Sequence, residues 1–295
     1  MKLSSLSGYA FCSILFVLFL SILPELPASA EQQEDAMAHA MSDAKLTAIR
    51  GPANIPLLDQ ATLELPEGYV YVPAKEGAEI MQAMGNDTSS NFYGLVFPAD
   101  GDSHWYIQIN YIKSGYITDA DAKNWNADEL LSHLKEKTDE ENKESKAKGL
   151  PTIDIVGWAA PPSYDTTTHK LIWAVDGNQS DVGNVINYTT IALGREGFFD
   201  LTLITKKSDI TSDKEDANKI LAALNYTNGK RYEDYVAGKD HLAEFGLATL
   251  ITGVVAKKLG LFALIGVIFL KVWKGLIIFV VIFWKKIIKL LGLKK

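Results

Sequence analysis

The chain of 295 residues contains a single cysteine, Cys12. It lies inside an apolar run from Tyr9 to Leu23, and not at the end of that run, where a lipoprotein cysteine would stand. Lys2 precedes the run and Ala28-Ser29-Ala30 follows it, which is the layout of a secretory signal peptide cleaved after Ala30. The alternative is an uncleaved N-terminal anchor. Without residues 1–30 the chain has no cysteine, which excludes disulfides and thiolate chemistry.

Acidic residues are missing from the last part of the chain, residues 246–295, which instead hold nine Lys. Between them, residues 259–284 are almost wholly apolar. About 20 such residues suffice to cross a bilayer, so the pattern predicts a C-terminal transmembrane helix. Flanking lysines that snorkel and an interfacial tryptophan are typical of such an anchor. Here they are Lys257, Lys258, Trp284, Lys285 and Lys286.

Two further lysines, Lys271 and Lys274, fall near the middle of this apolar run. A lysine at the centre of a membrane helix costs roughly 2.5–3.5 kcal/mol, which the many Leu, Ile, Phe and Val residues can outweigh. Most lysines of the segment fall on one side of the helix. Three geometries follow: a single tilted span, two short crossings as in a re-entrant hairpin, or a helix lying in the interface.

Charge divides the chain at the predicted membrane. Residues 31–245 carry 19 basic and 35 acidic side chains, a net charge of −16. So acidic a domain is a poor nucleic-acid binder, because binding to phosphates requires basic side chains. The positive-inside rule places the lysine-rich C-terminus in the cytoplasm and the acidic domain outside.

The exported segment, residues 31–245, is predicted to be one α+β domain with a mainly antiparallel sheet and packed helices. Alternating or β-branched segments predict strands, and amphipathic segments with start and stop signals predict helices. The strands are expected at 61–65, 69–72, 93–97, 105–111, 153–158, 170–175, 184–193 and 198–205, and the helices at 74–84, 127–148 and 212–224.

Local signals refine these elements. Asn126 with Glu129 predicts an N-cap for the long helix, and Ser212 with Glu215 predicts a capping box for the next helix. Asp240 is expected to cap a helix that continues through Gly246 into the membrane. The Pro161-Pro162 pair predicts a turn.

Motifs for metals, nucleotides and known hydrolases are missing. The five histidines show no metal-ligand spacing, and there is no phosphate-binding glycine loop. A loop starting at Asp119 is rich in oxygen ligands, but it lacks the glycine and the final glutamate of a calcium-binding EF-hand. We therefore predict no metal and no cofactor.

One group of residues could line a shallow polar site. His169 lies four residues after Asp165, and the hairpin residue Arg195 could approach both. The full candidate set is Asp119, Asp121, Trp158, Tyr164, Asp165, His169 and Arg195. The alternative interpretation of these residues is a solvated loop and a turn.

An ordered set of short motifs resembles a known family. The motifs are Gly94 to Pro98, Gly115-Tyr116 with Asp119 and Asp121, Gly157-Trp158 followed by Pro161 to Asp165, Asn187-Tyr188, Leu193 to Arg195, Gly229 to Tyr232, and Tyr235 with Lys239-Asp240. From about residue 60 onward the chain resembles the bacterial membrane-anchored family called domain of unknown function 2167. The resemblance implies a bacterial envelope protein with a C-terminal anchor in the inner membrane and implies no activity. The order of elements also resembles the antiparallel α/β sandwich of PsbP-like and Mog1-like proteins, a likeness of fold alone.

Three functions remain open. The first is a membrane-tethered envelope domain that binds a protein partner or organises a complex, because anchor and domain are recognisable but a catalytic set is not. The second is an accessory that binds a small ligand in its sheet. The third is an envelope hydrolase that uses Asp119, Asp121, Asp165 and His169. The sequence favours a non-enzymatic role, with the lipid bilayer and an envelope protein as partners.

Overall fold

The computed structural model describes residues 30–84, 86, 88–100, 103–122, 125–147, 152–179 and 183–252. These residues form an α+β fold with one large antiparallel sheet, as predicted. In spatial order its strands are β1 (Ile49–Arg50), β4 (Tyr69–Pro73), β5 (Phe92–Pro98), β6 (Tyr106–Ile112), β10 (Phe198–Lys206), β9 (Gly183–Leu193), β8 (Lys170–Gln179) and β7 (Ile153–Asp165). A small sheet holds β11 (Leu224–Tyr226), β3 (Ala61–Leu65) and β2 (Ala53–Leu57). The helices are α1 (Ala30–Thr47), α2 (Ala74–Ala83), α3 (Ala127–Ala147), α4 (Ile210–Ala222), α5 (Leu247–Thr252) and the 3₁₀ helix η1 (Tyr232–Asp234).

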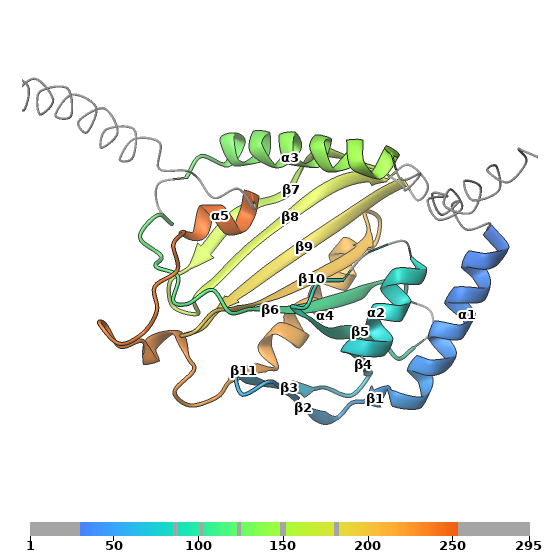
Figure 1. The fold of residues 1–295 in the computed structure, drawn as a ribbon, viewed down its shortest axis with the longest axis horizontal. Helices are drawn as coiled ribbons and strands as arrows, with labels where there is room; N and C mark the ends of the chain where they lie inside the picture. Colours follow the sequence, from blue (N-terminus) through green and yellow to red (C-terminus); the bar gives the residue numbers. More distant parts are fainter. Residues whose placement is uncertain are drawn as a thin grey trace, which may run out of the picture.

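One face of the large sheet is mainly apolar at its centre. Paired residues of neighbouring strands share a face, so the registers place Ala174, Tyr188, Leu203, Ile107 and Val96 in one row across five strands. This face packs against α4 and the small sheet, which together close the largest core of the molecule. Figure 1 shows α4 behind the sheet and the small sheet below it.

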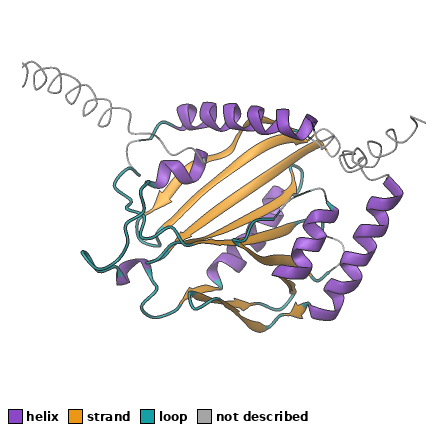
Figure 2. Cartoon of the chain, viewed as in Figure 1, coloured by secondary structure: helices purple, strands orange, loops and turns teal. Residues whose placement is uncertain are grey.

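Among the described residues, helices cover the opposite face only at its two ends. At one end α3 and α5 pack on β8 and β9 through Leu130, Leu247 and Ile251. At the other end α1 and α2 pack on β4 and β5 through Ala40, Ile80 and Leu95. Between the two ends no helix of the described part of the chain lies in front of the strands, as Figure 2 shows. The register explains why, because the row Trp173, Thr189, Thr202, Gln108 and Leu95 is apolar at its ends and polar in its middle.

Most of the expected elements are present, with several corrections. The oxygen of Asn126 accepts the N–H groups of Asp128 at 2.9 Å and Glu129 at 3.4 Å, which confirms the predicted cap of α3. The capping box at Ser212 is wrong, because α4 begins at Ile210 after Asp209 and no side chain caps it. Pro161-Pro162 does not form a turn; it lies within β7. The short strands β1, β2 and β11 have no counterpart among the predicted elements.

The outer strands of the large sheet are poor templates for further pairing. β1 has only two residues. β7 contains two prolines, and its register with β8 is interrupted in three places. The α3 side chains of Lys135 and Asn142 bind its backbone, through the carbonyl of Val156 and through both polar groups of Ile153. Bulges, prolines and covering side chains are the features that prevent edge-to-edge association.

The predicted terminal segments lie outside the described residues. Among the residues that the structure does describe, no helix combines the length and the apolar character needed to cross a membrane. The signal peptide expected at residues 1–30 falls outside them except for its last residue. The apolar run at 259–284 and the anchor residues Lys257, Lys258, Lys271, Lys274, Trp284, Lys285 and Lys286 lie outside them as well.

Candidate functional site

Three residues of the predicted polar site come together at one end of the large sheet. The hydroxyl of Tyr164 donates to the carboxylate of Asp119 at 3.2 Å and lies 3.2 Å from Nδ1 of His169. Burial and the nearby Asp119 carboxylate raise the pKa of Tyr164, so the hydroxyl keeps its proton. His169 adopts a positive φ of 53° at the end of the β7–β8 turn. The group is therefore a hydrogen-bonded corner, in which a tyrosine stands between carboxylate and imidazole.

A stack of aromatic rings surrounds this corner. The ring of Tyr232 lies 4.1 Å from that of His169 and 4.5 Å from that of Tyr116, centroid to centroid. Tyr116 in turn stacks on Tyr235 at 3.9 Å. The hydroxyl of Tyr232 donates to the buried carbonyl of Ile117 at 2.9 Å, and burial raises its pKa. These contacts hold η1 and the loop before α3 onto the sheet.

Asp121 has a structural role in the fold. Its two carboxylate oxygens accept the N–H groups of Leu247 and Ala248, both at 3.1 Å, and so cap the first turn of α5. A Cβ atom on Gly246 would lie 2.4 Å from an Asp121 oxygen, so a larger residue there would push the Asp121 carboxylate away from α5. The expectation that Asp240 caps this helix is wrong, because Asp240 binds Arg195 and the N–H of Val236.

Trp158 and Asp165 also form hydrogen bonds that hold the fold together. The indole N–H of Trp158 donates to the carbonyl of Ala127 at 3.0 Å, which joins β7 to the start of α3. The carboxylate of Asp165 accepts the N–H of Thr167 and the hydroxyl of Thr168, both at 2.8 Å. These bonds lower the pKa of Asp165, and they shape the β7–β8 turn.

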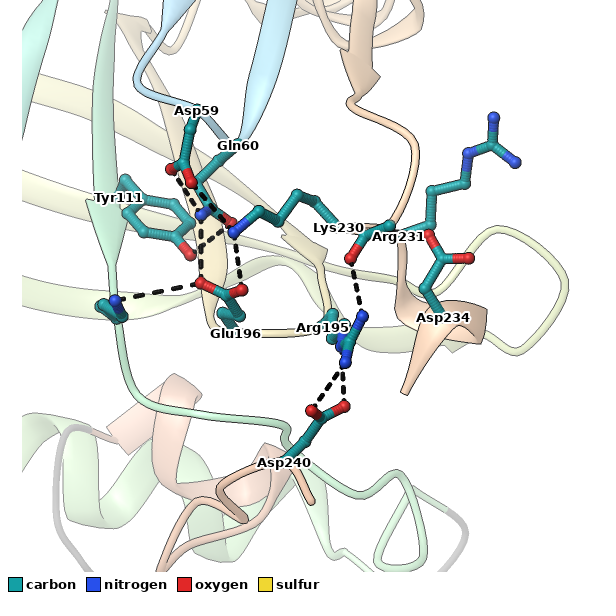
Figure 3. Close-up of polar contacts among 11 residues, drawn as sticks. Asp59, Gln60, Tyr111, Arg195, Glu196, Lys230, Arg231, Asp234 and Asp240 are labelled. Carbon is teal, nitrogen blue, oxygen red and sulfur yellow. Dashed lines mark hydrogen bonds and ion pairs between the residues drawn. The ribbon is translucent and has the colours of Figure 1, made fainter. Parts of the chain in front are cut away.

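Arg195 belongs to a different polar network, drawn in Figure 3. Its guanidinium forms a bidentate pair with Asp240 at 2.7 and 2.8 Å and donates to the carbonyl of Gly229 at 3.1 Å. Beside it, Lys230 binds Glu196 at 2.6 Å and Asp59 at 2.9 Å. The lysine and its hydrogen bonds lower the pKa of both carboxylates. This network joins the β9–β10 hairpin to the β2–β3 turn, and so joins the two sheets.

The larger candidate site is the polar centre of the open face, which we call the sheet groove. It is a cavity of about 400 Å³ over β6, β9 and β10, bounded by the end of α2 and by α3. Its floor is made of side chains from the three strands, and its walls come from the two helices and the start of β7. Its lining residues include Met81, Tyr106, Gln108, Asn110, Glu141, Val185, Asn187, Asp200, Thr202 and Ile204.

Asp200 is the carboxyl group on the floor of the sheet groove. Desolvation raises the pKa of its carboxyl from 3.8 to about 6, while hydrogen bonds from Thr202 and Asn110 oppose this shift. The Thr202 hydroxyl donates to Asp200 at 2.8 Å and lies 3.0 Å from the hydroxyl of Thr189. The amide of Gln108 donates to Asn110 at 3.2 Å. The floor is therefore a connected polar network around one carboxyl group.

Sequence reasoning did not identify this groove, although a signal for it exists. Polar residues alternate with buried apolar ones in all three central strands, at Gln108 and Asn110, at Asn187 and Thr189, and at Asp200 and Thr202. Each pattern alone indicates a strand with one solvent-facing side. Only their register shows that the three sets share one face.

No described residues form a group of three or more His, Cys, Asp or Glu side chains that could hold a metal ion.

The family model described as "Protein of unknown function (DUF2167)" matches residues 49–283. The chain belongs to this family. The match spans the small sheet, the large sheet and the sheet groove.

Other comparisons add little to the DUF2167 assignment. A search of curated proteins finds no match. The solution structure of cyanobacterial PsbP (CyanoP) from Synechocystis sp. PCC 6803 is similar with a TM-score of 0.37 at 8% identity, over 59% of this chain and 92% of that chain. We draw nothing about function from a similarity at that level.

Proposed function

We propose that this chain is a membrane-anchored bacterial envelope protein whose exported domain binds a small polar ligand in the sheet groove. The observation that carries the proposal is the groove itself, a cavity of about 400 Å³ with converging amide, hydroxyl and carboxyl groups on a rigid sheet. Cavities of about 300–1,000 Å³ with a few placed polar groups are typical of small-molecule sites.

The groove favours a ligand over the other two functions. Strand addition, a common way to bind a peptide partner, needs an open sheet edge, and both outer strands of the large sheet are short or covered. A hydrolase using Asp119, Asp121, Asp165 and His169 needs these groups to converge. Asp121 instead accepts two backbone N–H groups of α5, and Asp165 accepts an N–H group and a threonine hydroxyl of its own turn. Pull-down of the tagged full chain from membranes tests for an envelope protein partner that binds in another way.

The ligand is tested by mass spectrometry of small molecules released from the purified full chain on denaturation. Asn187→Phe places a bulky side chain in the groove and is expected to abolish the released species. The matched control is Asn178→Phe, the same change at an exposed position of the neighbouring strand β8, which should retain it. Equal release from both variants, or no release from the unaltered chain, would contradict the proposal.

The anchoring part of the proposal rests on the two terminal segments of the sequence. N-terminal sequencing of the mature protein should begin at Glu31, after cleavage at Ala30. Residues 1–20 still attached would mean that the first segment is a second anchor.

Labelling of a cysteine introduced as Leu293→Cys tests the topology. With a single span the thiol is reachable from the cytoplasm only, and labelling of intact cells by an impermeant reagent would contradict this arrangement. Replacing Lys271 and Lys274 by Leu should leave insertion intact. If the segment instead lies in the interface, the change should convert it into a span, because two costs of roughly 2.5–3.5 kcal/mol are removed.

A further inference from the structure

The charges in the sheet groove have one sign. Two of the described lining residues are acidic, Asp200 on β10 and Glu141 on α3, and none of them is Lys, Arg or His. Glu141 has a partner, the ammonium of Lys137 at 3.6 Å. The partners recorded for Asp200 are neutral, the hydroxyl of Thr202 and the amide of Asn110. Asp200 is thus a desolvated carboxyl group for which the described part of the chain supplies no cationic partner.

Such a group is costly when ionised. A carboxylate withdrawn from water is stabilised by hydrogen bonds and above all by a paired cation. Two neutral donors compensate only in part, which is why the pKa of Asp200 stays above its usual value. A ligand that brings a positive charge into the groove would supply the missing partner.

The other residues that line the sheet groove indicate what else a bound ligand would contain. Met81, Val185 and Ile204 provide aliphatic surface on the walls and floor. Gln108 and Asn187 provide amides that can donate and accept hydrogen bonds. A molecule that fits has a short apolar body and at least one cationic hydrogen-bond donor.

We propose that the sheet groove binds a small organic cation, with an ammonium group of the ligand paired to the carboxylate of Asp200. The inference rests on the proposed function, since it names the ligand class for the same groove. It predicts that binding is coupled to the loss of a proton from Asp200, because only the carboxylate attracts the ammonium group.

The coupling between ligand binding and deprotonation of Asp200 predicts how affinity changes with pH, in both direction and magnitude. With a free pKa of about 6, Asp200 is mostly protonated at pH 5 and mostly ionised at pH 7. Affinity for an ammonium ligand should therefore rise by about tenfold from pH 5 to pH 7. Glu141 and Tyr106 are the other titratable groups that line the groove. Because burial raises the pKa of Tyr106 from 10.0, its hydroxyl stays protonated throughout this range.

The experiment is isothermal titration of the purified full chain with three probes, the polyamine spermidine, the neutral polyol sorbitol and the dianion succinate, at pH 5 and pH 7. Spermidine should bind, sorbitol and succinate should bind at least tenfold more weakly, and the affinity for spermidine should show the stated pH dependence. Asp200→Asn should weaken spermidine binding at pH 7 by at least tenfold and remove that dependence. Asp35→Asn, the same change on an exposed part of α1, is the matched control.

The controls separate groove binding from general attraction to an acidic protein. Non-specific attraction would be equally weak for both variants and would disappear in high salt, which screens exposed charges. Spermidine binding that is equal in the unaltered chain and in Asp200→Asn overturns the inference. Groove-dependent binding of sorbitol or succinate without spermidine binding also overturns it and leaves the proposed function standing. If none of the probes binds and no molecule is released from the purified chain, both proposals fail. The pH dependence of the unaltered chain decides the matter even if Asp200→Asn does not fold.

Discussion

The two faces of the large sheet differ in how they are covered. The face toward α4 is mainly apolar and is closed by α4 and the small sheet. The opposite face is apolar only beneath α3 and α5 and beneath α1 and α2, and its centre is polar and open. The first face provides most of the stability, because stability follows buried apolar surface. The second leaves a cavity on a rigid floor, and this division lets a binding site vary without loss of the core.

The largest expected effect tests this division directly. Leu203 and Ile204 are neighbours on β10 whose side chains point to opposite faces, and Leu203 is 1% exposed. Leu203→Ala should lower the free energy of unfolding by about 2–5 kcal/mol, since it leaves a cavity in the main core. Ile204→Ala, which removes an aliphatic side chain from the groove face, should cost about 1 kcal/mol. Urea unfolding of both variants measures the difference. Equal decreases in the free energy of unfolding would mean that both faces contribute equally to stability.

The next effect concerns Asp200 and the pH dependence of stability. Its folded pKa of about 6 lies above the usual value of 3.8, so between these values the folded chain keeps a proton that the unfolded chain has released. The contribution of Asp200 therefore becomes less favourable as pH rises through this window and is constant above it. Asp200→Asn should stabilise the chain by about 3 kcal/mol at pH 7 and have little effect at pH 4.

The readout is thermal or urea unfolding of the unaltered chain and of Asp200→Asn from pH 2 to pH 7. Asp165→Asn is a control of opposite sign. The pKa of Asp165 is lowered by its turn hydrogen bonds, so its stabilising contribution is present at pH 7 and is lost as pH falls through its folded pKa. A gap between the unaltered chain and Asp200→Asn that shrinks as pH rises would contradict the groove chemistry.

The smallest of the three effects lies where the second face is covered. Asp121→Ala removes the acceptor for two N–H groups of α5 and should cost about 1 kcal/mol, the usual value of an N-cap. Amide hydrogen exchange at Leu247 and Ala248 should speed up more than exchange in β10. Asp121→Asn retains one oxygen acceptor and should give an intermediate result. Unchanged exchange in Asp121→Ala would show that packing alone holds α5.

Local sequence signals predicted the strands better than they predicted which helices lie over the open face of the sheet. The alternation of Trp105, Ile107, Ile109 and Tyr111 indicated one buried side, and all four are buried. By the same alternation, the residues between them, such as Gln108, are expected on the opposite side of the strand. They line a cavity because α2 and α3 stand on either side, and no local pattern reports how far apart two helices lie. The cap of α3 by Asn126 was predictable because its partners follow within three residues.

Long-range polar contacts were beyond sequence reasoning. Asp121 caps a helix 126 residues later, and Arg195 selects Asp240 and not Asp165. A carboxylate bonds whichever donors the fold brings near, and the spacing of Asp165 and His169 contains no information about that choice. Asp119, Tyr164 and His169, which meet at the corner, were all in the predicted candidate set. The tyrosine stack around the corner was not predicted.

The docking of α5 has a mechanical consequence. A pulling force applied at Thr252, the last described residue, acts first on α5, which is held by two hydrogen bonds and by the side chains of Leu247 and Ile251. The β9–β10 pairing behind it extends over nine residue pairs. Tension on the C-terminal end should therefore detach α5 before the sheet opens. The release would uncover apolar surface beside α3 while the floor of the groove keeps its shape.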